Sequence, residues 1–158
     1  MGEVLEVYID TAEKRNESGK VYAFGCLFPA RRELNYCRRM RYTSNDETTF
    51  AQLCALAHIL VKADHLNKTK EKEGNDGKNR AVERIIVRTN ARRFVSSIQM
   101  ELSKFYSDGY LDQSTRKTHV IEIVLSYRQI IPVDLYFAST SDAHVGEVAT
   151  LAASALNA

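Results

Sequence analysis

Three strand-like segments before residue 43 restrict the folds open to this chain more than any other feature of the sequence. The first lies within residues 4–12, is rich in β-branched and aromatic residues, and is expected to end at the carboxylate of Asp10. A polar turn over 11–19 separates it from a mostly buried strand at 20–28, and a third strand is expected at 33–42. Sequential strands joined by short polar turns form an antiparallel meander, so we expect the chain to begin with one.

The rest of the chain alternates between helical and strand-like patterns. Ser44-Asn45-Asp46 offers N-cap residues for an amphipathic helix of about 18 residues that ends near His65. Residues 67–80 contain no large apolar side chain and predict a flexible polar loop. Further strands are expected at 84–89 and 133–138, and further helices at 94–105, 119–130 and 145–156. The predicted order is β-β-β-α-β-α-α-β-α, an α/β fold in which one domain over 1–158 holds a five-stranded mixed sheet, three strands antiparallel and then two parallel, flanked by helices.

Composition excludes several classes of protein. The net charge is only +2, so there is no strongly basic arm that would bind any polyanion. Cys26, Cys37 and Cys54 are odd in number and form no CxxC pair, which favours reduced thiols and an intracellular protein. No long apolar run exists and charges occur throughout residues 1–15, so neither a membrane span nor a signal peptide is expected.

Five short segments become informative when they are taken together, because they follow one another in order along nearly the whole chain. They are Tyr8-Ile-Asp10-Thr-Ala, Thr49-Phe-Ala-Gln52-Leu-Cys-Ala-Leu, Val87-Arg-Thr-Asn90, Phe105-Tyr-Ser-Asp-Gly-Tyr110 and Val145-Gly-Glu147-Val-Ala149-Thr-Leu-Ala. In this order the chain resembles the type 1 ribonuclease H family. The segments resemble its first strand with a leading aspartate, its Ala-Glu-Leu helix, its strand ending in Thr-Asp, its Trp-x-x-x-Gly-Trp region and its closing helix. The resemblance implies a ribonuclease H-like fold.

The same resemblance implies an altered active site. The family holds two divalent metal ions with four carboxylates and cleaves the RNA strand of an RNA/DNA hybrid. The matching positions here are Asp10, Gln52, Asn90 and Ala149, so a single carboxylate remains. Unit charges about 4 Å apart interact by roughly 4 kcal/mol at an effective dielectric constant near 20, so losing three of them removes much of the affinity for metal. We therefore expect a catalytically inactive member with no catalytic residue, no bound metal and no other cofactor.

An alternative stays open at this point. If Asp142 or Glu147 supplied the missing charge, the chain would be an active, magnesium-dependent endonuclease acting on RNA/DNA hybrids. Glu147 lies two residues before Ala149, about 200° around a helix, which argues against that substitution. The four histidines share no HxxxH spacing, so a zinc site is not expected.

A domain without catalysis can still bind. Arginine side chains and aromatic rings suit phosphates, ribose and bases. The candidate nucleic-acid-binding residues are Arg38, Arg39, Arg41, Arg92, Arg93 and Tyr110. Arginines also cover sheet edges without binding anything. The sequence thus leaves two hypotheses: a module that binds an RNA/DNA hybrid or structured RNA, and an interaction or scaffold module whose partner is a protein or a larger assembly.

Overall fold

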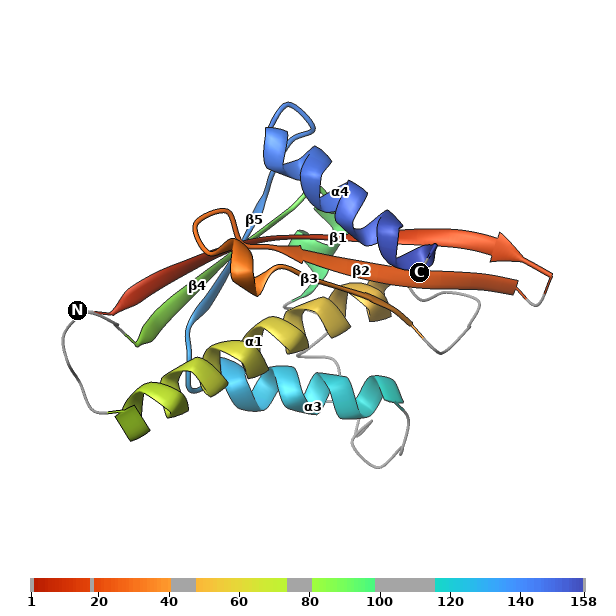
Figure 1. Ribbon diagram of the computed structural model, residues 1–158. Helices are drawn as coiled ribbons and strands as arrows, with labels where there is room; N and C mark the ends of the chain where they lie inside the picture. Colours follow the sequence, from red (N-terminus) through yellow and green to blue (C-terminus); the bar gives the residue numbers. More distant parts are fainter. Residues whose placement is uncertain (1, 18, 41–47, 74–80, 99–115, 158) are drawn as a thin grey trace.

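The computed structural model describes residues 2–17, 19–40, 48–73, 81–98 and 116–157, with a mixed sheet at its centre (Figure 1). The strands are β1 (Glu3–Asn16), β2 (Gly19–Leu27), β3 (Tyr36–Arg39), β4 (Val82–Thr89) and β5 (Val133–Phe137). Their order across the sheet is β3-β2-β1-β4-β5. The first three strands pair antiparallel, whereas β4 pairs parallel with β1 and β5 parallel with β4. The predicted mixed sheet and element order are confirmed.

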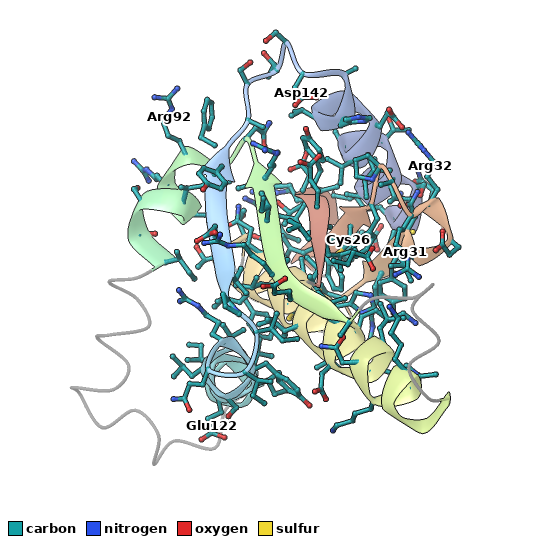
Figure 2. All side chains as sticks on the ribbon, turned by 90° about the vertical axis from the view of Figure 1, so that its left-hand side faces the viewer. Cys26, Arg31, Arg32, Arg92, Glu122 and Asp142 are labelled. Carbon is teal, nitrogen blue, oxygen red and sulfur yellow. The ribbon has the colours of Figure 1, made fainter. Side chains whose placement is uncertain are left out.

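Helices cover both faces of this sheet. The long helix α1 (Thr48–Glu73) and the helix α3 (Arg116–Arg128) lie on one face, and α4 (Ala143–Leu156) crosses the other (Figures 1 and 2). Residues 92–98, which directly follow β4, are also helical. Two layers of helices enclose one sheet, and each face of the sheet therefore has its own apolar contacts.

Alternation along β1 divides the core between the two faces. Leu5, Val7 and Ile9 belong to the large apolar cluster that includes the buried side of α1. Tyr8 points the other way and packs against Val145 and Val148 of α4. Asp10 has the same parity as Tyr8 and so lies on the face that α4 covers.

The first strand is longer than the sequence predicted, which corrects the expected place of Asp10. β1 continues beyond Asp10 to Asn16, and its last residues pair with the start of β2 in a long hairpin. Gly19 has a φ of 128°, a left-handed conformation that glycine adopts without strain at the hairpin turn. Cross-strand pairing outweighs the polar character of residues 11–16, so Asp10 lies within a strand rather than at its end.

The first helix is also longer than predicted, so the polar loop expected at 67–80 is wrong over 67–73. α1 runs to Glu73 because Asn67 fixes its last turns to the sheet. The Asn67 amide accepts from the N–H of Val82 at 2.7 Å and donates to the Val82 carbonyl at 3.1 Å. β5 pairs with β4 only from Ile85 onward, so among the described residues the start of β4 has no partner strand on that side. The Asn67 side chain supplies the hydrogen bonds to Val82 that a strand would make there.

Smaller differences concern element ends. The third strand is confined to Tyr36–Arg39 and follows a 3-10 turn at Arg32–Leu34, which shortens the predicted strand at 33–42. α3 begins and ends a few residues before the predicted 119–130. The predicted N-cap residues 44–46 and the loop at 74–80 lie outside the described residues. Within the described part, no helix is both long and apolar enough to cross a membrane.

Candidate functional site

Asp10 lies in the middle of β1, under α4. Its same-face neighbours pack along that helix: Tyr8 contacts the first turns, and Ala12 packs against the cluster containing Ala155 and Leu156 at its end. Asp10 pairs with Gly25 of β2, and a Cβ atom added to Gly25 would lie 2.9 Å from the backbone nitrogen of Ala152. The helix therefore approaches the sheet closely at the level of Asp10, which only a glycine in β2 permits.

The Asp10 carboxylate is half-buried. It accepts a hydrogen bond from the backbone N–H of Thr11 at 2.7 Å. Burial raises the pKa of Asp10 above its usual value, and the Thr11 hydrogen bond opposes this shift only in part. A partly desolvated carboxylate held on rigid backbone is the kind of group found at functional sites.

The fold places the other three positions around this strand. Tyr8 is paired with Arg88, the last pair between β1 and β4, and Asn90 is the residue that follows the end of β4 at Thr89. Ala149 belongs to α4, which covers the Asp10 face, and is half-buried. Gln52 lies in the first turns of α1 and is buried, with 7% of its surface exposed. The positions named from the sequence thus come from β1, from the residue after β4, and from α1 and α4 on opposite faces of the sheet.

The donor set at these positions is weak for metal ions. Asp10 alone carries charge; an amide oxygen from Gln52 or Asn90 is neutral, and the methyl group of Ala149 donates nothing. Across the described residues there is no group of three or more His, Cys, Asp or Glu side chains placed to hold a metal ion. Of these four positions, Asp10 therefore offers the only charged oxygen ligand.

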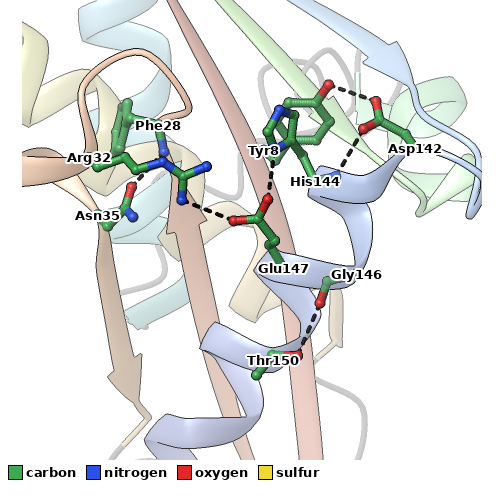
Figure 3. Close-up of polar contacts among 9 residues, drawn as sticks. All are labelled: Tyr8, Phe28, Arg32, Asn35, Asp142, His144, Gly146, Glu147 and Thr150. Carbon is green, nitrogen blue, oxygen red and sulfur yellow. Dashed lines mark hydrogen bonds and ion pairs between the residues drawn. The ribbon is translucent and has the colours of Figure 1, made fainter.

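A polar network at the start of α4 engages both acids that were considered as replacements (Figure 3). Asp142 caps α4 by accepting from the N–H of His144 at 3.0 Å, and it accepts from the Tyr8 hydroxyl at 2.7 Å. Glu147 pairs with Arg32 at 3.0 Å, and its other oxygen lies 3.1 Å from Nδ1 of His144. These contacts join β1, the turn after β2 and the start of α4.

The network perturbs the acidity of its members in a consistent way. Burial and the bond to Asp142 raise the pKa of Tyr8 to about 12, so its hydroxyl stays a donor. The Tyr8 and His144 bonds hold the pKa of Asp142 below its usual value, and Arg32 followed by His144 does the same for Glu147. Both acids are therefore ionised and already bound to protein donors.

Tyr8 and Arg32 were not predicted as site residues. The position of Tyr8 two residues before Asp10, on the same strand face, was an available signal for Tyr8. Nothing in the sequence pairs Arg32 with Glu147, because 115 residues separate them.

The candidate binding residues fall at opposite edges of the sheet. Arg38 and Arg39 are exposed on β3, where alternation directs Arg38 to the α1 face and Arg39 to the α4 face. Arg92 and Arg93 are exposed at the start of the helix after β4, and the Arg92 guanidinium lies 4.2 Å from the centre of the Phe137 ring of β5. Figure 2 places Arg92 on the far side of the sheet from Arg31 and Arg32. Arg41 and Tyr110 lie outside the described residues.

This topology defines a class of fold. Three antiparallel strands followed by two parallel ones, with α1 and α3 on one face and α4 on the other, is the ribonuclease H-like fold. Comparison with solved structures agrees. The prototype foamy virus protease-reverse transcriptase superposes with a TM-score of 0.67 at 11% sequence identity, over 96% of this chain and 20% of that one.

Two further structures are similar. The foamy viral protease-reverse transcriptase in complex with an RNA/DNA hybrid gives a TM-score of 0.59 at 10% identity, over 96% of this chain and 20% of that chain. RNase H1 from the halophilic archaeon Halobacterium salinarum gives 0.56 at 14% identity, over 98% of each chain. The chain thus spans about a fifth of these two viral protease-reverse transcriptase chains and nearly all of the archaeal RNase H1. No protein-family profile matches the sequence, and no curated protein matches it.

Proposed function

We propose that this chain is a ribonuclease H-like domain that binds nucleic acid without cleaving it. The observation that carries the proposal is the donor set around Asp10: one carboxylate, two amides and one methyl group at the four positions that resemble the family's metal-binding residues. Two magnesium ions bring a charge of +4 into a small site, and neutral amide oxygens hold such ions weakly compared with carboxylates. Compared with four carboxylates, these positions carry one negative charge.

The state of the neighbouring acids supports the same proposal. Releasing Asp142 towards Asp10 would remove the cap of α4 and the acceptor of the Tyr8 hydroxyl. Releasing Glu147 would break its contacts with Arg32 and His144. Each change replaces an existing interaction by a charge placed near another carboxylate, which costs free energy until a cation binds.

Nucleic acid is the partner that the exposed groups near this site favour. Arg92 and Arg93 come two and three residues after Asn90, the third of the four positions, and both are exposed. A structurally similar protein, the foamy viral protease-reverse transcriptase, has been solved with an RNA/DNA hybrid. Guanidinium groups bind phosphates in a bidentate manner, and this contact does not require cleavage. An RNA/DNA hybrid is therefore the first ligand to test.

The test of catalysis compares the natural chain with a restored variant carrying Gln52→Glu, Asn90→Asp and Ala149→Asp. Both are incubated with an RNA/DNA hybrid in magnesium and in manganese. We expect no cleavage by the natural chain, and cleavage by the restored variant that Asp10→Asn abolishes. Metal-dependent cleavage by the natural chain, lost on Asp10→Asn, would establish the active endonuclease instead.

The test of binding measures fluorescence anisotropy of a labelled hybrid against salt concentration. We expect the affinity to fall as salt rises, and Arg92→Ala with Arg93→Ala to lower the slope of log K against log salt by up to about 2. The matched control, Arg15→Ala with Lys20→Ala, removes two cations from the hairpin and should leave the slope nearly unchanged. If the hybrid does not bind at low salt, the interaction module with a protein partner is the remaining function.

A further inference from the structure

The outer edge of β5 presents main-chain groups that can pair with another strand. β5 is the last strand in the sheet order. The N–H of Ile85 donates to the Pro132 carbonyl, and the N–H of Ala138 donates to the Thr89 carbonyl, both at 2.9 Å. Main-chain groups alternate in direction along a strand, so those of the even-numbered residues of β5 face β4. The groups of Val133, Leu135 and Phe137 then face outward.

We propose that this edge pairs with the same edge of a second copy of the chain, antiparallel and about a two-fold axis at Leu135. In this register Leu135 is opposite Leu135 of the second copy, and Val133 is opposite its Phe137. All of these residues direct their N–H and C=O groups outward, so each opposed pair exchanges two hydrogen bonds. The two sheets join into one continuous sheet. This inference is independent of any nucleic-acid binding.

The side chains of β5 are complementary to themselves in this register. On the α1 face the opposed pairs are Leu135 with Leu135 and Val133 with Phe137, all apolar, and Phe137 is 39% exposed in the single chain. On the α4 face Asp134 is opposite Tyr136, which is 47% exposed. Asp134 keeps its charge and forms an ion pair with Arg84 at 2.7 Å. Apolar pairs stabilise a strand pair, and no like charges stand directly opposite each other.

The other edge of the sheet differs in a way that supports this choice. β3 carries Arg38 and Arg39, both exposed, and self-pairing there would bring four guanidinium groups together. Charged side chains on an edge strand are a common means of preventing strand pairing. The residues of β5 include one charge, Asp134, and it already has a partner. The sheet thus has one edge protected by charge and one edge fit for a second copy.

The test measures the mass of the full chain by sedimentation up to a concentration of about 1 mM. We expect a concentration-dependent dimer. Tyr136→Asp places a carboxylate opposite Asp134 at two symmetric positions and should raise the dimer dissociation constant at least about tenfold. The matched control Tyr136→Lys places a cation there instead and should keep the dimer.

A second variant keeps the proposal falsifiable by a different route. Leu135→Pro removes the outward N–H at the two-fold axis, while the hydrogen bonds of β5 to β4 use other residues. We expect it to be monomeric with an unchanged far-ultraviolet circular dichroism spectrum. The proposal is overturned if the natural chain stays monomeric at the highest concentration, or if Tyr136→Asp and Tyr136→Lys dimerise equally well.

Discussion

Replacing the carboxylate of Asp10 should stabilise the protein, because the charge is partly buried and its hydrogen bond is local. In Asp10→Asn the amide oxygen can still accept from the N–H of Thr11, so the substitution removes the charge and little else. Removing a poorly solvated charge from a functional position commonly raises stability by about 1 kcal/mol. For a chain of this size that gain corresponds to roughly 2–4 °C in Tm.

The pH dependence of that gain follows from the direction of the pKa shift. The pKa of Asp10 is raised in the folded state above its ordinary value of 3.8, so the folded protein holds the proton more tightly than the unfolded chain. Stability therefore falls as pH rises from the unfolded pKa through the folded pKa, and the cost is complete above the folded value. The advantage of Asp10→Asn should be full at neutral pH and vanish below the unfolded pKa.

Urea unfolding at neutral and at acidic pH measures both quantities. The control is Glu13→Gln, which removes an exposed acid of the same strand. Because Glu13 lies 3.7 Å from Lys20 in an exposed ion pair, this substitution should change the free energy of unfolding by less than about 0.5 kcal/mol. If Asp10→Asn is less stable than the natural chain at neutral pH, or if its advantage persists unchanged in acid, a cation balances Asp10 and the reasoning about an unpaired charge is wrong.

Three other predictions concern contacts that hold the fold around the site. Asn67→Ala should lower the free energy of unfolding by about 2 kcal/mol, because two hydrogen bonds to Val82 are lost, whereas Thr69→Ala on the same helix should cost less than about 0.5 kcal/mol in urea unfolding. His58 stacks on Tyr36 at 4.0 Å between centroids, and burial, then Lys62 and Arg38, lower its pKa below 6.5. The contribution of the neutral His58 ring to stability is complete above pH 6.5 and is lost as the pH drops from 6.5 through the folded pKa. His58→Phe should therefore flatten the decline of Tm as the pH falls below 6.5. Tyr8→Phe should raise the pKa of Asp142 towards its ordinary value, as followed by nuclear magnetic resonance titration, since the Tyr8 bond is the main cause of its depression.

Periodicity predicted the parts of the fold that follow from local sequence. The run of β-branched and aromatic residues in β1 and the amphipathic pattern of α1 placed these elements correctly, because their apolar side chains form the core. The ends of the same elements could not be predicted, since they depend on partners far along the chain. Residues 11–16 are polar but pair with β2, and residues 67–73 are polar but continue a helix that Asn67 fastens to β4.

The candidate site was predictable to a similar degree. The order of five short segments identified Asp10, Gln52, Asn90 and Ala149 from the sequence, and the fold places Asp10 in β1 and Asn90 just after the neighbouring strand β4. The contacts of Asp142 and Glu147 could not be foreseen, because their partners Tyr8 and Arg32 precede them by more than a hundred residues. Side-chain pairing over such separations has no local pattern.

These contacts also explain how α4 keeps its position on the sheet. The start of the helix is fixed to β1 by Tyr8 and Asp142, and to the turn after β2 by Arg32 and Glu147. Its middle lies against Gly25 so closely that a Cβ atom there would meet the helix backbone. The helix is therefore positioned by hydrogen bonds, the ion pair of Arg32 with Glu147, and packing against the sheet. The restored variant, with Gln52→Glu, Asn90→Asp and Ala149→Asp, should therefore have a lower Tm than the natural chain in the absence of metal, because it adds like charges around Asp10. Magnesium should raise the Tm of the restored variant again and leave the Tm of the natural chain unchanged.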